Sequence, residues 1–338
     1  MRNAAFDLLW TGFDGLDAGE VKGPEAGAII LFARNLDADP ISGPARCHAL
    51  IRGLHAKWGH GVPLAVALDQ EGGAVSRLRV WAGPTPSLRA IWEQGGAAAC
   101  ARWGGLWGQG LRILGFNVDF APVADLWDGH PNTGMGDRCA SLDPGEVTVA
   151  AGAFLHGLES TGVRGCLKHF PGLGGTRVDS HRALPELEDE VQIQRNLQPF
   201  RALAHQNRLM MVAHLKTPGT AGLPASFHRG SVAENPWGIQ GRWIPDDLEM
   251  GGCGDWDWKD KVRLSLEAGH QALLVCQSAQ GIDACATALA GMPENLWALP
   301  RQNFLDLRRN LMPSEAGAFD ASRWAAWLSA VRNEAAGS

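Results

Sequence analysis

The sequence has no tyrosine, although it contains 14 tryptophans, and this bias by itself carries no structural prediction. It also lacks any run of about 18 apolar residues, which excludes a membrane-spanning helix. The N-terminal stretch has one arginine followed closely by acidic residues, and its apolar part is too short for a secretory signal. We therefore expect a cytoplasmic protein with no membrane partner.

Clusters of lysine and arginine are missing as well. The 30 basic and 36 acidic residues give a net charge of −6 and are spread along the chain. Binding to nucleic acid or to an anionic membrane surface needs a basic patch, so we expect neither partner. The sequence does not determine the oligomeric state, and we take a monomer as the default.

The seven cysteines form no CxxC pair, and their number is odd. Several lie within apolar runs, where cysteine behaves as a small buried hydrophobic residue. This pattern favours a reducing compartment and argues against both a disulfide framework and a structural zinc site.

Eight short apolar runs recur along the 338 residues, of which 45% are hydrophobic. Their nearly continuous apolarity is typical of strands that are buried on both faces, as in a parallel sheet. The predicted strands lie within 5–11, 26–34, 63–69, 116–123, 163–169, 209–215, 241–246 and 271–276.

Segments with helical spacing separate most of these runs. They include 43–58, 96–114, 144–160, 188–206 and 281–291, and the chain from about 295 onward is also helical in pattern. Strands that alternate with helices predict βαβ units, and eight of them predict a single-domain (β/α)₈ barrel over residues 1–338. The competing doubly wound open sheet lacks its usual GxGxxG signal.

Polar residues stand where several of the apolar runs end. In a parallel barrel the active site is built at the carboxyl ends of the strands, so these positions are candidate site residues. Each one alone is more often a helix cap or a loop residue, but their recurrence in separate segments indicates a shared site. The candidates are Asp69, Lys168, His169, His214 and Asp246.

Three glycine-containing segments add further candidates. In KHFPGLGGTRVDSHRALP (168–185), Asp179 can orient the imidazole of His181, although an ordinary surface turn capped by Asp179 is an equal alternative. Arg77 follows Asp69 across two glycines, as a partner for sugar hydroxyls or as a local ion pair. Arg138 lies in the glycine-rich segment 131–141 and can face either a ligand or solvent.

Several motifs together resemble glycoside hydrolase family 3, and in particular its single-domain bacterial β-N-acetylhexosaminidases of the NagZ type. The resemblance runs in order from about residue 5 to 290. The motifs are DQEGG-x-V-x-R (69–77), FNVDFAPVADL (116–126), GDR (136–138), KHFPG-x-G with DSH-xx-LP (168–185) and PDDLEM (245–250). The long 168–185 signature is the specific one, whereas GDR is short.

The resemblance implies a (β/α)₈ barrel and a retaining exo-β-N-acetylglucosaminidase that removes GlcNAc from peptidoglycan fragments, as in muropeptide recycling. It implies Asp246 as the nucleophile and His181, backed by Asp179, as the acid and base; Asp247 is then structural. It implies substrate binding by Asp69, Arg77, Arg138, Lys168, His169 and, less directly, His214. Neither a cofactor nor a metal is implied.

The chain departs from the family pattern at three positions. Leu173 replaces the usual histidine of PGHG, Ala74 replaces an arginine after DQEGG, and Pro245 replaces a serine before the two aspartates. Alternatives therefore stay open: a β-glucosidase-type member, a catalytically impaired sugar-binding barrel, and substrate-assisted catalysis with the Asp246–Asp247 pair. A barrel metallohydrolase is a remote alternative, because no HxH or HExxH pair occurs.

Overall fold

Eight parallel strands form the centre of the computed structural model, which describes residues 3–59, 61–129, 134–314 and 317–337. The strands pair in the order β10-β1-β2-β3-β6-β7-β8-β9, and every pair is parallel. Their bounds are β1 Leu9–Thr11, β2 Ala28–Ile30, β3 Ala65–Leu68, β6 Val118–Asp119, β7 Arg164–Phe170, β8 Leu209–Val212, β9 Arg242–Pro245 and β10 Leu273–Val275.

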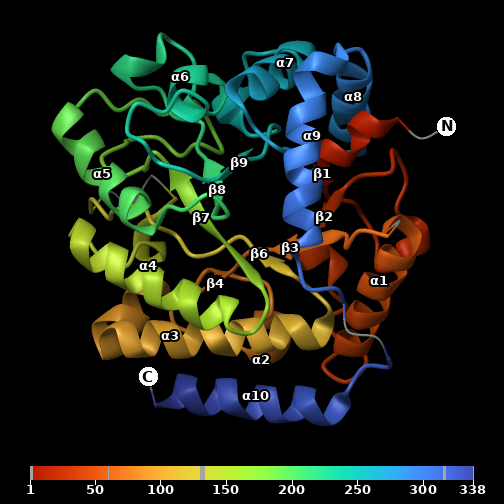
Figure 1. The fold of residues 1–338 in the computed structure, drawn as a ribbon. Helices are drawn as coiled ribbons and strands as arrows, with labels where there is room; N and C mark the ends of the chain where they lie inside the picture. The colour runs from red at the N-terminus through yellow and green to blue at the C-terminus, as the bar shows by residue number, and fades with distance from the viewer. Residues whose placement is uncertain (1–2, 60, 130–133, 315–316, 338) are drawn as a thin grey trace.

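The two edges of this sheet meet, so that it curls into a barrel (Figure 1). Beside the strand ends, the backbone N–H of Gln271 donates to the carbonyl of Trp243 at 2.8 Å, and that of Leu248 donates to Leu274 at 3.0 Å. Seven of the eight strands lie within their predicted runs, and β7 extends one residue beyond its run, to Phe170. The predicted (β/α)₈ barrel is therefore confirmed.

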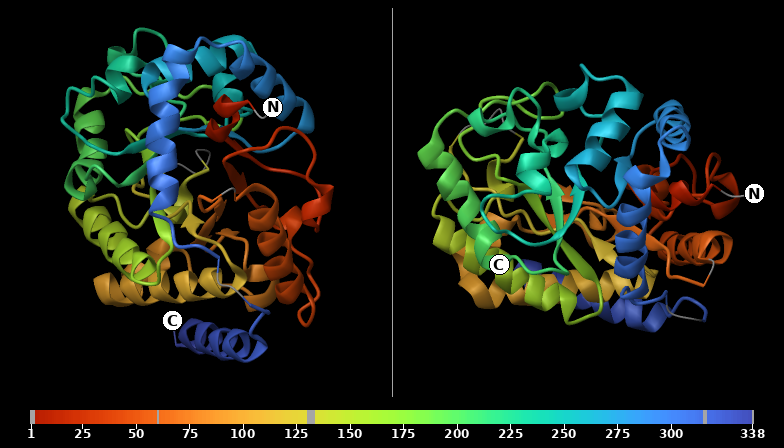
Figure 2. Two further views of the ribbon diagram at one scale, coloured as in Figure 1. Left: turned by 45° about the vertical axis from the view of Figure 1, so that its right-hand side comes forward. Right: turned by 45° about the horizontal axis from the view of Figure 1, so that its top comes forward.

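Helices surround the barrel in Figures 1 and 2. The longer ones are α1 Gly43–Trp58, α3 Leu88–Leu114, α4 Pro144–Glu159, α5 Glu190–Leu203, α7 Trp258–Ala268, α8 Ala279–Ala290, α9 Glu294–Arg309 and α10 Ala321–Ala336. Two single-turn helices, α2 Arg79–Ala82 and α6 Arg229–Val232, lie in the loops after β3 and β8. The C-terminal α10 packs against the outer side of α3, where Trp327 Nε1 donates to the Leu106 carbonyl at 2.6 Å. No helix in the described ranges has the length and apolarity needed to cross a membrane.

Two local differences from the sequence prediction have clear causes. The 5–11 run starts as a 3₁₀ helix, η1 Ala4–Leu8, because the Asn3 side chain caps it, and only its end is strand. Helix α3 starts eight residues before the predicted 96, at Leu88, where the Ser87 hydroxyl accepts from the Ala90 N–H. A kink at Gly95 and Gly96 divides α3, so the regular helical spacing begins only after it.

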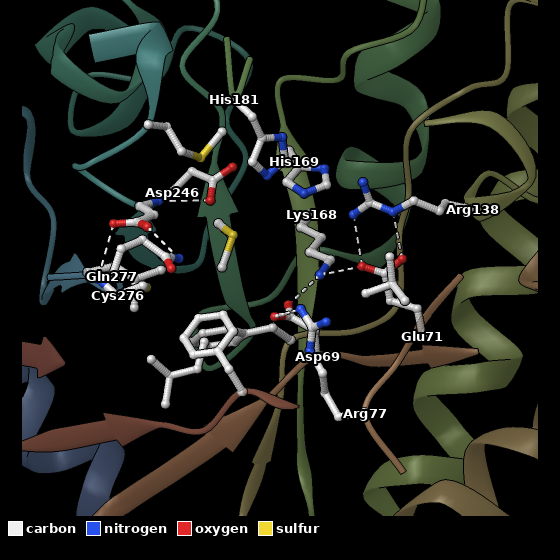
Figure 3. A pocket seen from close by; sticks show the side chains of 18 residues that line it. Asp69, Glu71, Arg77, Arg138, Lys168, His169, His181, Asp246, Cys276 and Gln277 are labelled. Atoms are coloured by element: carbon white, nitrogen blue, oxygen red, sulfur yellow. Dashed lines mark hydrogen bonds and ion pairs between the residues drawn. The ribbon is translucent and has the colours of Figure 1, made fainter. Parts of the chain in front are cut away.

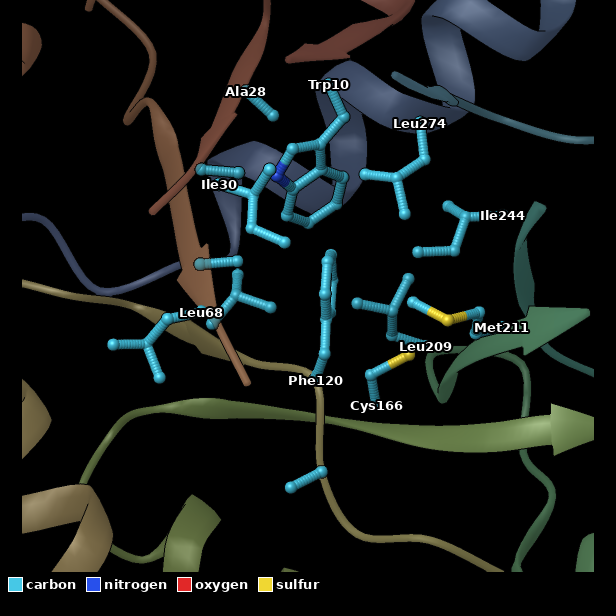
Figure 4. Close-up of a cluster of buried hydrophobic side chains, with 14 of the residues drawn as sticks. Trp10, Ala28, Ile30, Leu68, Phe120, Cys166, Leu209, Met211, Ile244 and Leu274 are labelled. Atoms are coloured by element: carbon cyan, nitrogen blue, oxygen red, sulfur yellow. The ribbon is translucent and has the colours of Figure 1, made fainter. Parts of the chain in front are cut away.

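Apolar side chains from all sides fill the barrel interior (Figure 4). The rings of Trp10 and Phe120 lie 4.9 Å apart between centroids at its centre, and Phe304 of α9 approaches Trp10 at 5.8 Å. The barrel is therefore a packed core and not a channel, as is usual for this architecture. Phe120 also lines the cavity described below, so the core forms the floor of the site.

Candidate active site

A cavity of about 320 Å³ opens at the carboxyl ends of the strands (Figure 3). Most of the predicted site residues line it, namely Asp69, Arg77, Arg138, Lys168, His169, His181 and Asp246. In Figure 3, His169, His181 and Asp246 converge on one part of the cavity, and charged side chains from β7 and from the loops after β3 and β6 face it from the other. The fold thus brings predicted residues from four separate segments together around one cavity.

The charged part of the cavity is an interlocked group that we call the cation–carboxylate cluster: Asp69, Glu71, Arg77, Arg138 and Lys168. Lys168 Nζ lies 2.9 Å from Asp69 Oδ1 and also contacts Glu71 Oε1. Arg138 donates two hydrogen bonds to the Glu71 carboxylate, from Nε at 2.8 Å and from Nη2 at 2.9 Å. Arg77 Nη2 lies 3.5 Å from Asp69 Oδ2.

Glu71 is the residue of this cluster that the sequence reasoning missed. Burial opposes its ionisation, but the charges and hydrogen bonds of Arg138 and Lys168 outweigh burial and hold its pKa well below the usual range. Asp69 and Glu71 stand two residues apart, and in extended chain such residues point to the same side. That spacing was the available signal, because β4 Gln70–Gly72 and β5 Val75–Ser76 form a small hairpin directly after Asp69.

His169 is oriented by a buried carboxylate that was also missed. Its Nδ1 lies 2.7 Å from Asp125 Oδ2, while Asp125 also accepts the backbone N–H groups of His169 and Leu173. The ladder between β7 and β8 shifts register between Leu167 and Phe170, which interrupts the strict alternation of side chains there. Consecutive residues Lys168 and His169 therefore both line the cavity.

Asp246 follows β9 and is partly buried in the cavity wall. Burial opposes its ionisation, but the neighbouring imidazole of His169 and a 2.8 Å hydrogen bond from the Asp247 N–H lower its pKa. Burial instead raises the pKa of Asp247 to about 6, with Glu249 and Asp246 adding to the effect. The surroundings thus favour the ionised form of Asp246 and the protonated form of its neighbour Asp247.

Asp179 and His181 form the predicted pair. His181 Nδ1 lies 2.7 Å from Asp179 Oδ1, which also accepts the His181 backbone N–H at 3.0 Å. The alternative reading of this segment as a turn capped by Asp179 is therefore compatible with the pair. His181 is about two-thirds exposed and lines the cavity, whereas Asp179 lies behind it.

His214 is not among the lining residues, contrary to its prediction as a pocket member. It is fully buried, with Nε2 3.0 Å from the Asp247 carbonyl and Nδ1 2.7 Å from Ser226 Oγ. Burial lowers its pKa, so the neutral ring donates from Nε2 to the carbonyl and accepts from the serine hydroxyl. It supports the backbone beside Asp246 from behind.

The side chains at the three departures from the family pattern take no part in the hydrogen bonds and ion pairs of the site. Leu173 is buried and its N–H donates to Asp125 at 2.7 Å, so the loop root is anchored without the usual histidine. Ala74 is exposed at the turn of the β4–β5 hairpin and does not line the cavity. Pro245 ends β9 opposite Val212. Residues 131–133 of the segment predicted around Arg138 lie outside the described residues.

The metallohydrolase alternative needs several ligands around one point. Within the described ranges, no three His, Cys, Asp or Glu side chains are grouped as metal ligands. Two of the strand-end histidines have protein partners: Asp125 Oδ2 lies 2.7 Å from His169 Nδ1, and both ring nitrogens of His214 are engaged. This arrangement gives the alternative no support.

Comparison with known proteins agrees with the geometry. The family model "Glycosyl hydrolase family 3 N terminal domain" matches residues 10–296. The chain belongs to glycoside hydrolase family 3. A β-hexosaminidase of Pseudomonas aeruginosa is 32% identical over 96% of both chains.

Solved family 3 structures share the fold. NagZ from Neisseria gonorrhoeae, in complex with N-trifluoroacetyl-D-glucosamine, is 26% identical with a TM-score of 0.79, over 98% of this chain and 97% of that one. A family 3 member from Mycobacterium smegmatis is 30% identical with a TM-score of 0.78, over 92% and 97%. The protein is thus a glycoside hydrolase whose cavity stands where a parallel barrel builds its active site.

Proposed function

We propose that this family 3 enzyme is a retaining exo-β-N-acetylglucosaminidase with Asp246 as nucleophile and His181 as acid and base. Two β-hexosaminidase relatives, which the chain matches over 96% and 82% of their lengths, support the activity. The observation that carries the mechanism is one cavity in which an ionised Asp246 faces two imidazoles while a cation–carboxylate cluster stands opposite.

In the first step Asp246 attacks the anomeric carbon, and the bond from that carbon to the leaving oxygen breaks. His181 donates its proton to this oxygen, so the leaving group departs as a neutral alcohol. In the second step His181 accepts a proton from water, whose oxygen displaces Asp246 and restores the carboxylate. Asp179 orients the ring through its contact with Nδ1.

The cation–carboxylate cluster supplies substrate binding. Its carboxylates accept hydrogen bonds from sugar hydroxyls, and Lys168, Arg77 and Arg138 donate to hydroxyl oxygens. Mutual pairing within the cluster fixes these groups before a ligand arrives, which reduces the entropy cost of binding. His169, held by Asp125, adds one further polar group between the cluster and Asp246.

The proposed substrates are GlcNAc-containing muropeptides, such as GlcNAc–anhydro-muropeptides from peptidoglycan turnover. The enzyme would then act in muropeptide recycling, on a soluble carbohydrate and with neither a nucleic acid nor a membrane partner. Release of GlcNAc from such a fragment, measured beside release from chitobiose, tests the preference for the muramyl leaving group. Equal kcat/KM values for the two would count against it.

The activity itself is tested with an aryl β-GlcNAc and an aryl β-glucoside, using wild type, Asp246→Ala and His181→Ala in parallel. We expect the wild type to prefer the GlcNAc substrate and Asp246→Ala to lose turnover. A preference for the glucoside would support the β-glucosidase alternative. GlcNAc binding without turnover by the wild type would indicate an impaired, sugar-binding barrel.

A further inference from the structure

The loop that carries His181 is attached at two places. Near its root, Asn196 Nδ2 donates to the carbonyls of Gly172 and Gly174 at 3.0 and 2.8 Å, and Gly175 N–H donates to Asp128 at 2.8 Å. Around His181 itself the attachment comes from a different segment, the turn η8 Gly251–Cys253 that follows Asp246.

This second attachment is made by two backbone N–H groups. Gly251 N–H donates to the carbonyl of His181 at 3.1 Å, and Gly252 N–H donates to the carbonyl of Ser180 at 2.9 Å. We call Gly251 and Gly252 the glycine dock. It joins the segment that follows the proposed nucleophile to the segment that holds the proposed acid and base.

Glycine is needed at both positions because neighbouring atoms approach the backbone closely. Backbone conformation does not require it, since neither residue has a positive φ. A Cβ on Gly251 would overlap the carbonyl of Arg182 and lie 2.9 Å from that of His181. A Cβ on Gly252 would lie 2.8 Å from the Cβ of His214. A side chain at either position therefore forces a displacement, and at Gly251 the displaced group is the loop.

The residues on either side of the dock are held by contacts outside the loop. Lys261 Nζ donates to the Leu248 carbonyl at 2.7 Å, and Cys253 Sγ lies 3.1 Å from the same carbonyl. The Glu249 carboxylate accepts from the Ser278 N–H and hydroxyl at the start of α8. The His181 side chain, by contrast, is about two-thirds exposed. A clash between the two segments should therefore move the loop.

We infer that the glycine dock is a positioning element that seats His181 against the sugar in line with Asp246. This inference rests on the proposed function, because the dock affects catalysis only if His181 transfers the proton. A misplacement of about 1 Å in a reacting group can cost about 100-fold in rate. The dock would thus set the rate of the proton-dependent step without touching the substrate.

The test uses Gly251→Ala, with Gly254→Ala as the matched control. Gly254 lies in the same segment at φ −66° and ψ −25°, and its Cβ would approach only the Gly251 carbonyl of its own turn, at 3.3 Å. Substrates with a poor alkyl leaving group and a good dinitrophenyl leaving group are compared by kcat/KM, which reports the glycosylation step. Proton donation matters for the first substrate and little for the second.

For Gly251→Ala we expect kcat/KM to fall about 100-fold with the alkyl glycoside and by less than about threefold with the dinitrophenyl glycoside. Gly254→Ala should match the wild type with both. In a His181→Ala background, Gly251→Ala should have no further effect, because the two changes remove the same function. Equal losses on both substrates, or fully additive losses in the double variant, would overturn the inference.

The outcomes separate this inference from the proposed function. If His181→Ala itself shows no dependence on the leaving group, the proposed role of His181 fails. If His181→Ala shows it and Gly251→Ala does not, only the dock fails. Should Gly251→Ala not fold, hydrogen exchange on the wild type decides: the Gly251 and Gly252 amides should be protected, and exchange at the rate of an unstructured chain would contradict the dock.

Discussion

Replacing Glu71 by glutamine should damage both stability and substrate binding. The Glu71 side chain is only 3% exposed and binds Arg138 with two hydrogen bonds and Lys168 with a third contact. Glutamine keeps the shape and one acceptor oxygen, but its amide group must face a cation and the negative charge is lost. Lys168 keeps Asp69 as a partner at 2.9 Å, whereas Arg138 loses its carboxylate.

Breaking a buried ion pair typically costs 3–5 kcal/mol, because the partner stays buried without compensation. Since Lys168 retains Asp69, we expect the lower end, about 3 kcal/mol, or a shift of roughly 100-fold in the unfolding equilibrium. The pKa of Glu71 is held well below its usual range, so its contribution is present above the unfolded value of about 4.3. It is lost as the pH falls through the lower folded value.

The assay is urea unfolding of wild type and Glu71→Gln at neutral and at acidic pH, together with KM for an aryl β-GlcNAc. Glu234→Gln is the control, because Glu234 pairs with Arg229 at 2.9 Å on an exposed surface where both side chains are about two-thirds exposed. Such a pair contributes about 0–1 kcal/mol. If Glu71→Gln costs no more than Glu234→Gln at neutral pH, or if its cost does not shrink in acid, the reasoning about the cluster is wrong.

Three further predictions concern other parts of the structure. Burial raises the pKa of Asp247 to about 6, so the protonated carboxyl group contributes stability that is fully present below about pH 4. This contribution is lost as the pH rises through about 6. Urea unfolding should show the loss in wild type and not in Asp247→Asn. Phe304→Ala should cost about 3–5 kcal/mol by opening a space beside Trp10, with KM unchanged because Phe304 does not line the cavity; a shifted KM would contradict this separation. Asp125→Asn should lower kcat/KM about tenfold by weakening the charge-assisted hydrogen bond to His169. A variant with the same kcat/KM as the wild type would show that this bond does not position the ring.

The barrel was predictable because its signals are local. A strand buried on both faces must be apolar along its length, so each strand could be recognised from its own sequence alone. Helix ends were also marked locally, as at Gly115, which ends α3 with a φ of 103° that few other residues adopt. Helix starts were less regular. The kink at Gly95 and Gly96 interrupts the helical periodicity of α3, so its first turns could not be predicted from the spacing of apolar residues.

The site was predictable where its partners are close in sequence or stand at strand ends. Asp179 and His181 are two residues apart, and Asp246 directly follows β9, so all three could be selected as candidates from the sequence. Asp125 pairs with His169 across 44 residues, and nothing local distinguishes it from a loop residue. His214 follows the strand-end rule as well, but its ring turns away from the cavity toward Ser226. Side-chain direction at a strand end depends on neighbouring strands, which the local sequence does not contain.

The central claim, that Asp246 forms a covalent bond to the sugar, is tested most directly by trapping. A 5-fluoro GlcNAc fluoride keeps the acetamido group, carries a good leaving group and slows hydrolysis of a glycosyl-enzyme. We expect peptide mass spectrometry to find the adduct on Asp246, and Asp246→Ala to remain unlabelled. Turnover of this donor without an adduct, or an adduct on Asp247, would contradict the proposed nucleophile. The absence of an adduct would favour substrate-assisted catalysis by the acetamido group.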